Sequence, residues 1–114
     1  MPADPRHLLP LGDLAFLILL ALGDGPAHGY AIGKEVAERS GGRLDPTTGA
    51  LYQALKRLAE SGLVAPAVAP SGDVDSRRKY FRITPLGKRV AAAEAERLNG
   101  MVATARAKRL FPAS

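Results

Sequence analysis

One segment of this sequence, residues 45–63, constrains the fold more than any other, because it predicts a helix with both ends marked. Asp45 is a typical N-cap residue, and Pro46 is typical of the first helical position, where its missing N–H costs nothing. Gly62 can take the left-handed conformation that closes a helix and lets the next residue fold back onto the last turn. Three leucines recur at the spacing of one helical face, so this helix must pack against other elements. Its expected buried face is Leu51, Leu55 and Leu58.

The flanking segments supply the elements against which that helix can pack. Asp13 is a plausible N-cap of an apolar helix, and Thr84 followed by Pro85 predicts the start of a long final helix. A polar loop over 70–76 separates two strand candidates. In order, we expect helices over 13–22, 29–39 and 46–61, strands over 64–69 and 79–83, and a helix over 85–110.

This order predicts a mainly α fold with a two-stranded β wing, a winged helix-turn-helix followed by a C-terminal dimerisation helix. We expect a loose N-terminal arm over 1–12, a DNA-binding domain over 13–84, and a dimerisation helix and tail over 85–114. A chain of 114 residues suits one compact domain with a thin core, which association with a second chain would help to stabilise.

The charge of the chain is concentrated in its C-terminal third. The net charge is +5, yet residues 77–114 hold ten basic and two acidic side chains. Such asymmetry indicates a polyanionic partner, either nucleic acid or an acidic membrane surface, although a solvated basic surface is the simpler reading. The absence of cysteine excludes disulfides, thiolate zinc sites and cysteine nucleophiles, and it fits a reducing compartment.

An apolar run near the N-terminus, Leu14 to Leu22, superficially resembles a signal peptide. It is far shorter than the ~20 residues that span a bilayer, and Asp13 interrupts the apolar region. We therefore expect a buried helix and a cytoplasmic protein with no membrane partner.

The N-terminal half of the second helix of a helix-turn-helix reads base edges in the major groove, and a basic wing contacts phosphates. Hydroxyl groups can donate or accept at base edges, and a glycine permits close approach of the backbone. On the expected reading helix the candidate contacts are Thr47, Thr48, Gly49, Tyr52, Gln53, Lys56 and Arg57. On the wing they are Arg77, Arg78 and Lys79. For the tyrosine we expect a packed ring with its hydroxyl facing out.

The final helix is expected to form a homodimer. At 1.5 Å per residue it would be ~40 Å long, so it must project beyond a domain this small. Its outer part carries an apolar stripe at helical spacing, and the helix over 13–22 is apolar on more faces than one domain can cover. The expected interface residues are Phe16, Leu19, Leu20, Leu98, Met101, Val102 and Ala105.

Other classes of function find little support. His28 is better explained as a residue that starts the helix over 29–39 than as a catalytic base, and Tyr30 is an inward candidate on that helix. With two histidines, no metal-ligand spacing and no paired acid and base, we expect no metal, no cofactor and no enzymatic activity. A winged helix that serves only as a protein–protein adaptor is the alternative, although an adaptor has no need of three adjacent wing cations.

Four pieces of the sequence, in this order, resemble the PadR family of transcriptional regulators: residues 28–32 (HGYAI), 49–58 (GALYQALKRL), 62–64 (GLV) and 78–87 (RKYFRITPLG). The resemblance implies a winged helix that binds double-stranded DNA, a dimer built from C-terminal helices packed on the partner's N-terminal helix, and usually repression. It leaves room for a small-molecule effector without specifying one. The sequence departs from the family pattern at Ala50, where threonine is common, and in its short C-terminal region without tryptophan.

Overall fold

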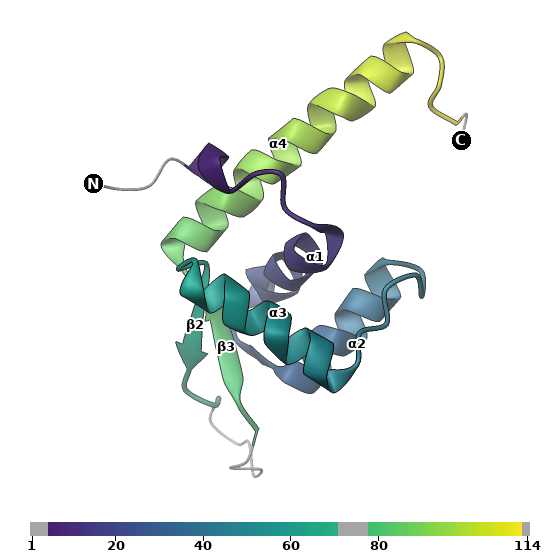
Figure 1. Ribbon diagram of the computed structural model, residues 1–114. Helices are drawn as coiled ribbons and strands as arrows, with labels where there is room; N and C mark the ends of the chain where they lie inside the picture. Colours follow the sequence, from purple (N-terminus) through teal and green to yellow (C-terminus); the bar gives the residue numbers. More distant parts are fainter. Residues whose placement is uncertain (1–4, 71–77, 113–114) are drawn as a thin grey trace.

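Four α-helices and a small sheet make up residues 5–70 and 78–112, the part of the chain that the computed structural model describes (Figure 1). The mainly α fold with a β wing is therefore confirmed. The helices are α1 Asp13–Ala21, α2 Gly29–Arg39, α3 Thr48–Glu60 and α4 Pro85–Ala107, and the strands are β1 Ala27–His28, β2 Val64–Ala67 and β3 Tyr80–Ile83. Two 3-10 turns, η1 Pro5–Leu8 and η2 Leu22–Asp24, flank α1.

The sheet has three antiparallel strands in the order β1-β3-β2, one more than the expected wing. Val64 pairs with Ile83 in the β2–β3 hairpin, and Ala27 pairs with Phe81 on the other side of β3. Because β1 has two residues, it is too short to show the alternation that reveals a strand in a sequence. It pairs with β3 and leads directly into α2, so the wing and the start of α2 are held together.

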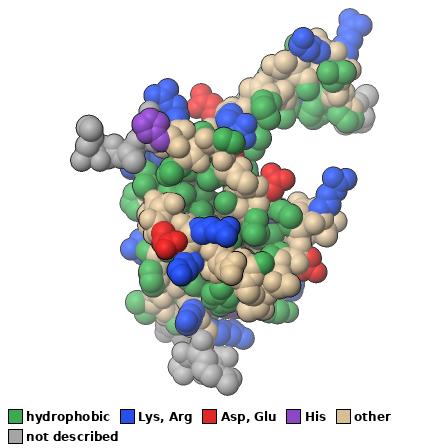
Figure 2. Space-filling model, in the orientation of Figure 1, with side chains coloured by type: hydrophobic (Ala, Val, Ile, Leu, Met, Phe, Trp, Pro, Cys, Tyr) green, Lys and Arg blue, Asp and Glu red, His purple; other side chains and the backbone are tan. Residues whose placement is uncertain are grey.

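α4 begins against the core and ends away from it. Its outer half projects beyond the other helices, as Figures 1 and 2 show. The helix ends at Ala107, three residues earlier than expected. Among helices of the described residues, none is long and apolar enough to cross a membrane.

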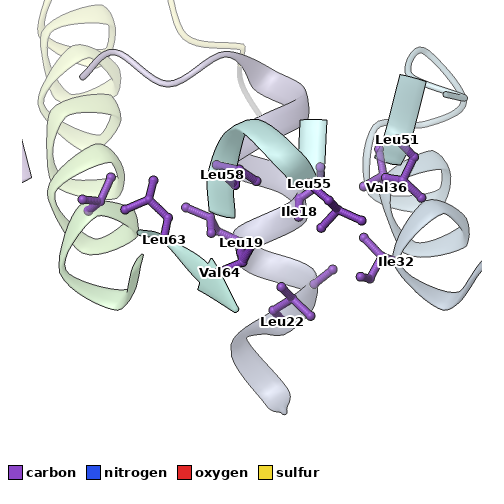
Figure 3. Close-up of a cluster of buried hydrophobic side chains, with 12 residues drawn as sticks. Ile18, Leu19, Leu22, Ile32, Val36, Leu51, Leu55, Leu58, Leu63 and Val64 are labelled. Atoms are coloured by element: carbon purple, nitrogen blue, oxygen red, sulfur yellow. The ribbon is translucent and has the colours of Figure 1, made fainter. Parts of the chain in front are cut away.

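The hydrophobic core surrounds α1, with side chains from α2, α3, α4 and β2 closing over it (Figure 3). This explains why α1 is apolar on nearly every face without requiring a second chain. Leu19, expected at a dimer interface, is 1% exposed within its own subunit, so that assignment is wrong. Leu20 remains 46% exposed and Phe16 is half-buried, which leaves one side of α1 for an outside contact.

The start of α3 differs from the expected one by two residues. Thr47, not Asp45, is the N-cap, and its Oγ1 accepts a hydrogen bond from the Ala50 N–H at 3.1 Å. Pro46 therefore precedes the helix rather than occupying its first position. Similarly, Gly12 rather than Asp13 stands at the cap of α1.

The end of α3 is as expected and is tied to the start of α4. Gly62 has φ +79°, and the Leu63 N–H bonds back to the Leu58 carbonyl at 2.9 Å, which completes a Schellman motif. Thr84 caps α4 by accepting from the Gly87 N–H, and its hydroxyl donates to the Gly62 carbonyl at 2.6 Å. One threonine thus joins two helix ends and fixes where α4 leaves the domain.

Residues 5–12 do not form the loose N-terminal arm that the sequence led us to expect. η1 packs beside α4, and the Leu11 N–H donates at 2.7 Å to the carboxylate of Glu94, a residue of α4 that is 1% exposed. Arg97 donates to the other carboxylate oxygen. A buried acceptor on α4 therefore holds the segment in place.

Candidate nucleic-acid interface

The N-terminal half of α3 presents a polar, solvent-exposed surface. Thr47, Thr48, Gly49 and Gln53 are all exposed, whereas Leu51 faces the core. The Thr47 oxygen is engaged as a cap, but its hydroxyl can still donate. This surface combines backbone N–H groups at a helix N-terminus with side chains able to bond base edges.

Lys56 and Arg57 lie on different edges of α3, although they are adjacent in sequence. Lys56 borders the hollow between α3 and the wing. Arg57 borders a different hollow, between α3 and the N-terminal segment near Leu8 and Leu11. Both side chains are exposed, but Lys56 is the one that shares a groove with the wing cations.

Tyr52 is largely a packing residue. Its ring meets Phe81 of β3 edge-on, with 6.0 Å between centroids, so the expected packing of the ring is confirmed. Its hydroxyl does not face out as expected but lies against Gly29 at the start of α2, where any added Cβ would overlap it. The half-buried tyrosine thus sets the distance between α2 and α3, and Gly29 is required by that close approach.

Tyr30 is 79% exposed, so its expected inward orientation is wrong. Ile32 and Val36, four residues apart, define the buried face of α2, and a residue two positions before Ile32 lies on the far side of a helix. This spacing could have revealed its exposure from the sequence. Tyr30 and Lys34 border the hollow that also contains Thr48, which adds an aromatic ring and a cation to the surface beside α3.

The wing contributes cations at its base. Arg78 and Lys79 are exposed immediately before β3, whereas Arg77 lies outside the described residues. Figure 2 shows Lys and Arg side chains gathered at this end of the molecule, next to the grey segment. Cations here and on α3 therefore lie on adjoining parts of the surface, as a groove-binding domain requires.

His28 caps α2, and its Nδ1 accepts from the Ala31 N–H at 3.2 Å, which confirms the expected structural role. Its ring contacts Tyr30 and Tyr80 at centroid separations of 6.4 and 5.4 Å. In residues 5–70 and 78–112 there is no group of acidic, histidine or cysteine side chains that could hold a metal ion.

The projecting half of α4 carries exposed apolar side chains. Met101 is 53% exposed and Val102 36%, while Leu98 and Ala105 are half-buried. Beyond the helix, Phe111 packs under the Arg106 guanidinium, 4.0 Å from the ring centroid. The hydrophobic side chains on this projecting part are visible in Figure 2.

This arrangement of a capped reading helix, a basic wing and a projecting C-terminal helix defines a DNA-binding regulator of the winged helix-turn-helix class. Residues 18–93 match the model of the transcriptional regulator PadR-like family. Because the match covers more than half of the chain, the protein belongs to that family, whose members are transcription regulators and not enzymes.

Two curated relatives are uncharacterized. One, a 37.1 kDa protein in transposon TN4556 of Streptomyces fradiae, is 42% identical over 93 residues, which cover 79% of this chain and 25% of that protein. The other, protein X of Lysinibacillus sphaericus, is 33% identical over 79 residues, which cover 68% of this chain and 70% of that protein. The chain thus spans only a quarter of the length of the first relative.

Solved structures of similar fold include transcription regulators. A PadR family regulator from Clostridium difficile R20291 superposes with a TM-score of 0.72 at 26% identity, covering 83% of this chain and 96% of that one. Bacillus subtilis PadR in complex with operator DNA gives a TM-score of 0.58 at 25% identity, covering 70% of this chain and 45% of that one.

Proposed function

We propose that this chain is a cytoplasmic repressor that binds a palindromic operator as a homodimer. The observation that carries the proposal is the exposed N-terminal half of α3 beside the cationic base of the wing. The similarity to Bacillus subtilis PadR, a protein solved on operator DNA, supports the same mode of binding. A repressor of this kind acts by occupying DNA that the transcription machinery needs.

The surface divides into residues that read bases and residues that hold phosphates. Thr48, Gly49 and Gln53 face outward at the end of α3 that enters a major groove in this class of protein, so they read base edges. Lys79 and Lys34, on either side of α3, contact phosphates and supply most of the affinity. Arg57 reaches DNA only from the opposite edge of α3, so its contribution is smaller.

The homodimer is proposed to form through the projecting half of α4. Its stripe around Met101 and Val102 packs against the exposed side of α1 in the partner, which consists of Phe16 and Leu20. The contact is reciprocal under two-fold symmetry, so one kind of surface serves both subunits. Two reading helices then lie about one DNA turn apart and recognise half-sites ~10 base pairs apart, centre to centre.

Fluorescence anisotropy with the DNA upstream of the chain's own gene tests the proposal, and a scrambled duplex is the control. If the dimer neutralises about six phosphates, log K should fall with log salt at a slope near −5. Tighter binding to the upstream duplex, together with reduced transcription of a reporter placed behind it, is the expected result. A slope near zero on both duplexes would reject DNA binding and favour the adaptor.

A further inference from the structure

Asp45 is a charged side chain for which the fold itself has no use. The sequence predicts it as the N-cap of α3, but Thr47 holds that position. The Asp45 carboxylate is exposed and forms no hydrogen bond or ion pair within the described residues. An ionised carboxylate only accepts hydrogen bonds, so the donor that binds it comes from solvent or from a ligand.

The backbone around Asp45 is held in one conformation. Because Pro46 follows it, Asp45 is restricted to an extended conformation, and the proline ring fixes the next φ angle. Thr47 is also extended, with φ −62° and ψ 161°. Three residues span at most about 10 Å, so the Asp45 backbone lies within that distance of Thr48. The carboxylate is therefore fixed close to the start of α3, and a bond to it requires little ordering of the chain.

A hollow of about 530 Å³ between α2 and α3 places Asp45 on the surface that is proposed to meet DNA. The same hollow is lined by Thr48, a proposed reader of bases, and by Lys34, a proposed phosphate contact. The phosphates of any duplex repel a carboxylate on this surface, so Asp45 weakens binding to DNA in general. That repulsion is offset only by a sequence that offers the carboxylate a hydrogen-bond donor.

The donors exposed in the major groove narrow the choice of base. They are the exocyclic amino groups of adenine and cytosine. In adenine the acceptor N7 stands beside the amino group and would repel a carboxylate, whereas cytosine presents no acceptor of its own there. Aspartate and glutamate accordingly pair with cytosine N4 in direct readout.

We propose that Asp45 is a specificity-determining residue that accepts a hydrogen bond from the N4 amino group of a cytosine, beside the base pair read by Thr48. Its charge lowers the affinity for all DNA, and its hydrogen bond restores affinity only for half-sites with cytosine at that position. The inference rests on the proposed function, because it requires the start of α3 to lie in the major groove.

Glu38 is the second carboxylate of this hollow and provides a matched control. It lies in the last turn of α2, eight positions or about 12 Å along the helix axis beyond Tyr30. α2 begins beside the sheet, where β1 pairs with β3, and runs away from the wing (Figure 1). Glu38 therefore stands back from the surface that meets DNA, and we expect it to repel phosphates weakly without reading a base.

Selection of bound sequences from a random duplex library, with the full chain, tests the proposal without knowledge of the operator. The wild-type chain should select a cytosine at one position of each half-site. Asp45→Ala should lose that preference alone. Asp45→Asn should shift it to adenine, because an amide can donate to adenine N7 and accept from N6. Glu38→Gln should select the same sequences as the wild type.

Competition titrations with the selected duplex give the magnitude. Replacement of the selected C·G pair should weaken wild-type binding by about tenfold or more, but should change the binding of Asp45→Ala by less than about twofold. Asp45→Ala should also bind a scrambled duplex about two- to fivefold more tightly, since one repulsive charge per subunit is gone. A role confined to the stability of α3 would change urea unfolding but would leave the base preference in place.

The possible outcomes separate this inference from the proposed function. Identical selected sequences for wild type and Asp45→Ala, or a loss of preference at a base other than cytosine, would overturn the inference while the proposed function stands. If Glu38→Gln loses the cytosine preference as fully as Asp45→Ala does, the charge of the hollow and not a contact by Asp45 is responsible, and the inference is again overturned. A wild-type chain that selects no sequence at all would reject the proposed function itself, and the inference with it.

Discussion

Replacement of Glu94 should destabilise the protein in a pH-dependent way. This carboxylate is 1% exposed, accepts the Leu11 N–H at 2.7 Å and also accepts a bond from Arg97. The hydrogen bond from Arg97, with the smaller help of the Leu11 N–H, lowers the pKa of Glu94 below its ordinary 4.5 despite the opposing effect of burial. The negative charge is therefore favoured by the fold.

The size of the effect follows from what each substitution leaves behind. Glu94→Ala removes the acceptor and leaves the Leu11 N–H without it, which costs about 1–3 kcal/mol. The Arg97 side chain is 35% exposed, so water replaces much of what it loses. We expect a loss of about 2 kcal/mol for Glu94→Ala and about 1 kcal/mol for Glu94→Gln, which keeps an oxygen acceptor but not the charge.

The pH dependence gives the sharper test. Because the pKa of Glu94 is lower in the folded state, its contribution is complete above the unfolded value of 4.5 and is lost as the pH falls through the folded value. The deficit of Glu94→Gln should therefore shrink on acidification below pH 4.5, where the wild-type side chain also becomes neutral. Urea unfolding at fixed protein concentration measures it, with exposed Glu96→Gln as the control. A Gln variant as stable as wild type at neutral pH, or a deficit unchanged in acid, would refute the reasoning.

Three further results are expected. Gly29→Ala should lower the free energy of unfolding by about 1–3 kcal/mol, because the added methyl group overlaps a packed tyrosine; a neutral effect in urea unfolding would contradict that close approach. In anisotropy titrations Thr48→Ala should cost ~1–3 kcal/mol of discrimination between operator and scrambled duplex, whereas Lys79→Ala should weaken binding to the two duplexes equally. Equal losses on the two duplexes for Thr48→Ala would show that this part of α3 does not read the base sequence. Met101→Glu should convert the dimer to a monomer, as measured by sedimentation, whereas the control Ala103→Glu, on the opposite face of α4, should leave the protein dimeric. If both variants remain dimers, the proposed interface is wrong.

The dimer test uses a point substitution because a truncation would confuse two effects. Removal of residues from 97 onward would delete the outer apolar stripe but also the guanidinium that bonds Glu94. A loss of stability could then be mistaken for a loss of the interface. Met101 accepts only a long contact from that guanidinium, at 3.7 Å, so its replacement leaves the buried carboxylate and its Leu11 bond in place.

Features that depend on a few neighbouring residues could be predicted from the sequence. Interactions within one or two helical turns determine four such features: the Schellman end at Gly62, the Thr84 cap with Pro85, the cap by His28 and the buried leucines of α3. The class of fold follows from the order of such elements. Even the two misplaced caps were wrong by only one or two residues: Gly12 directly precedes Asp13, and Thr47 lies two positions after Asp45.

Only the tertiary structure decided how these elements meet. The bond that holds the N-terminal segment joins residues 83 positions apart, Leu11 and Glu94, and the third strand exists only because β3 is there to pair with it. Likewise, the separation of Lys56 from Arg57 depends on which element covers each edge of α3. Local spacing determines which face of a helix is apolar, but it contains no information on which distant segment will cover that face.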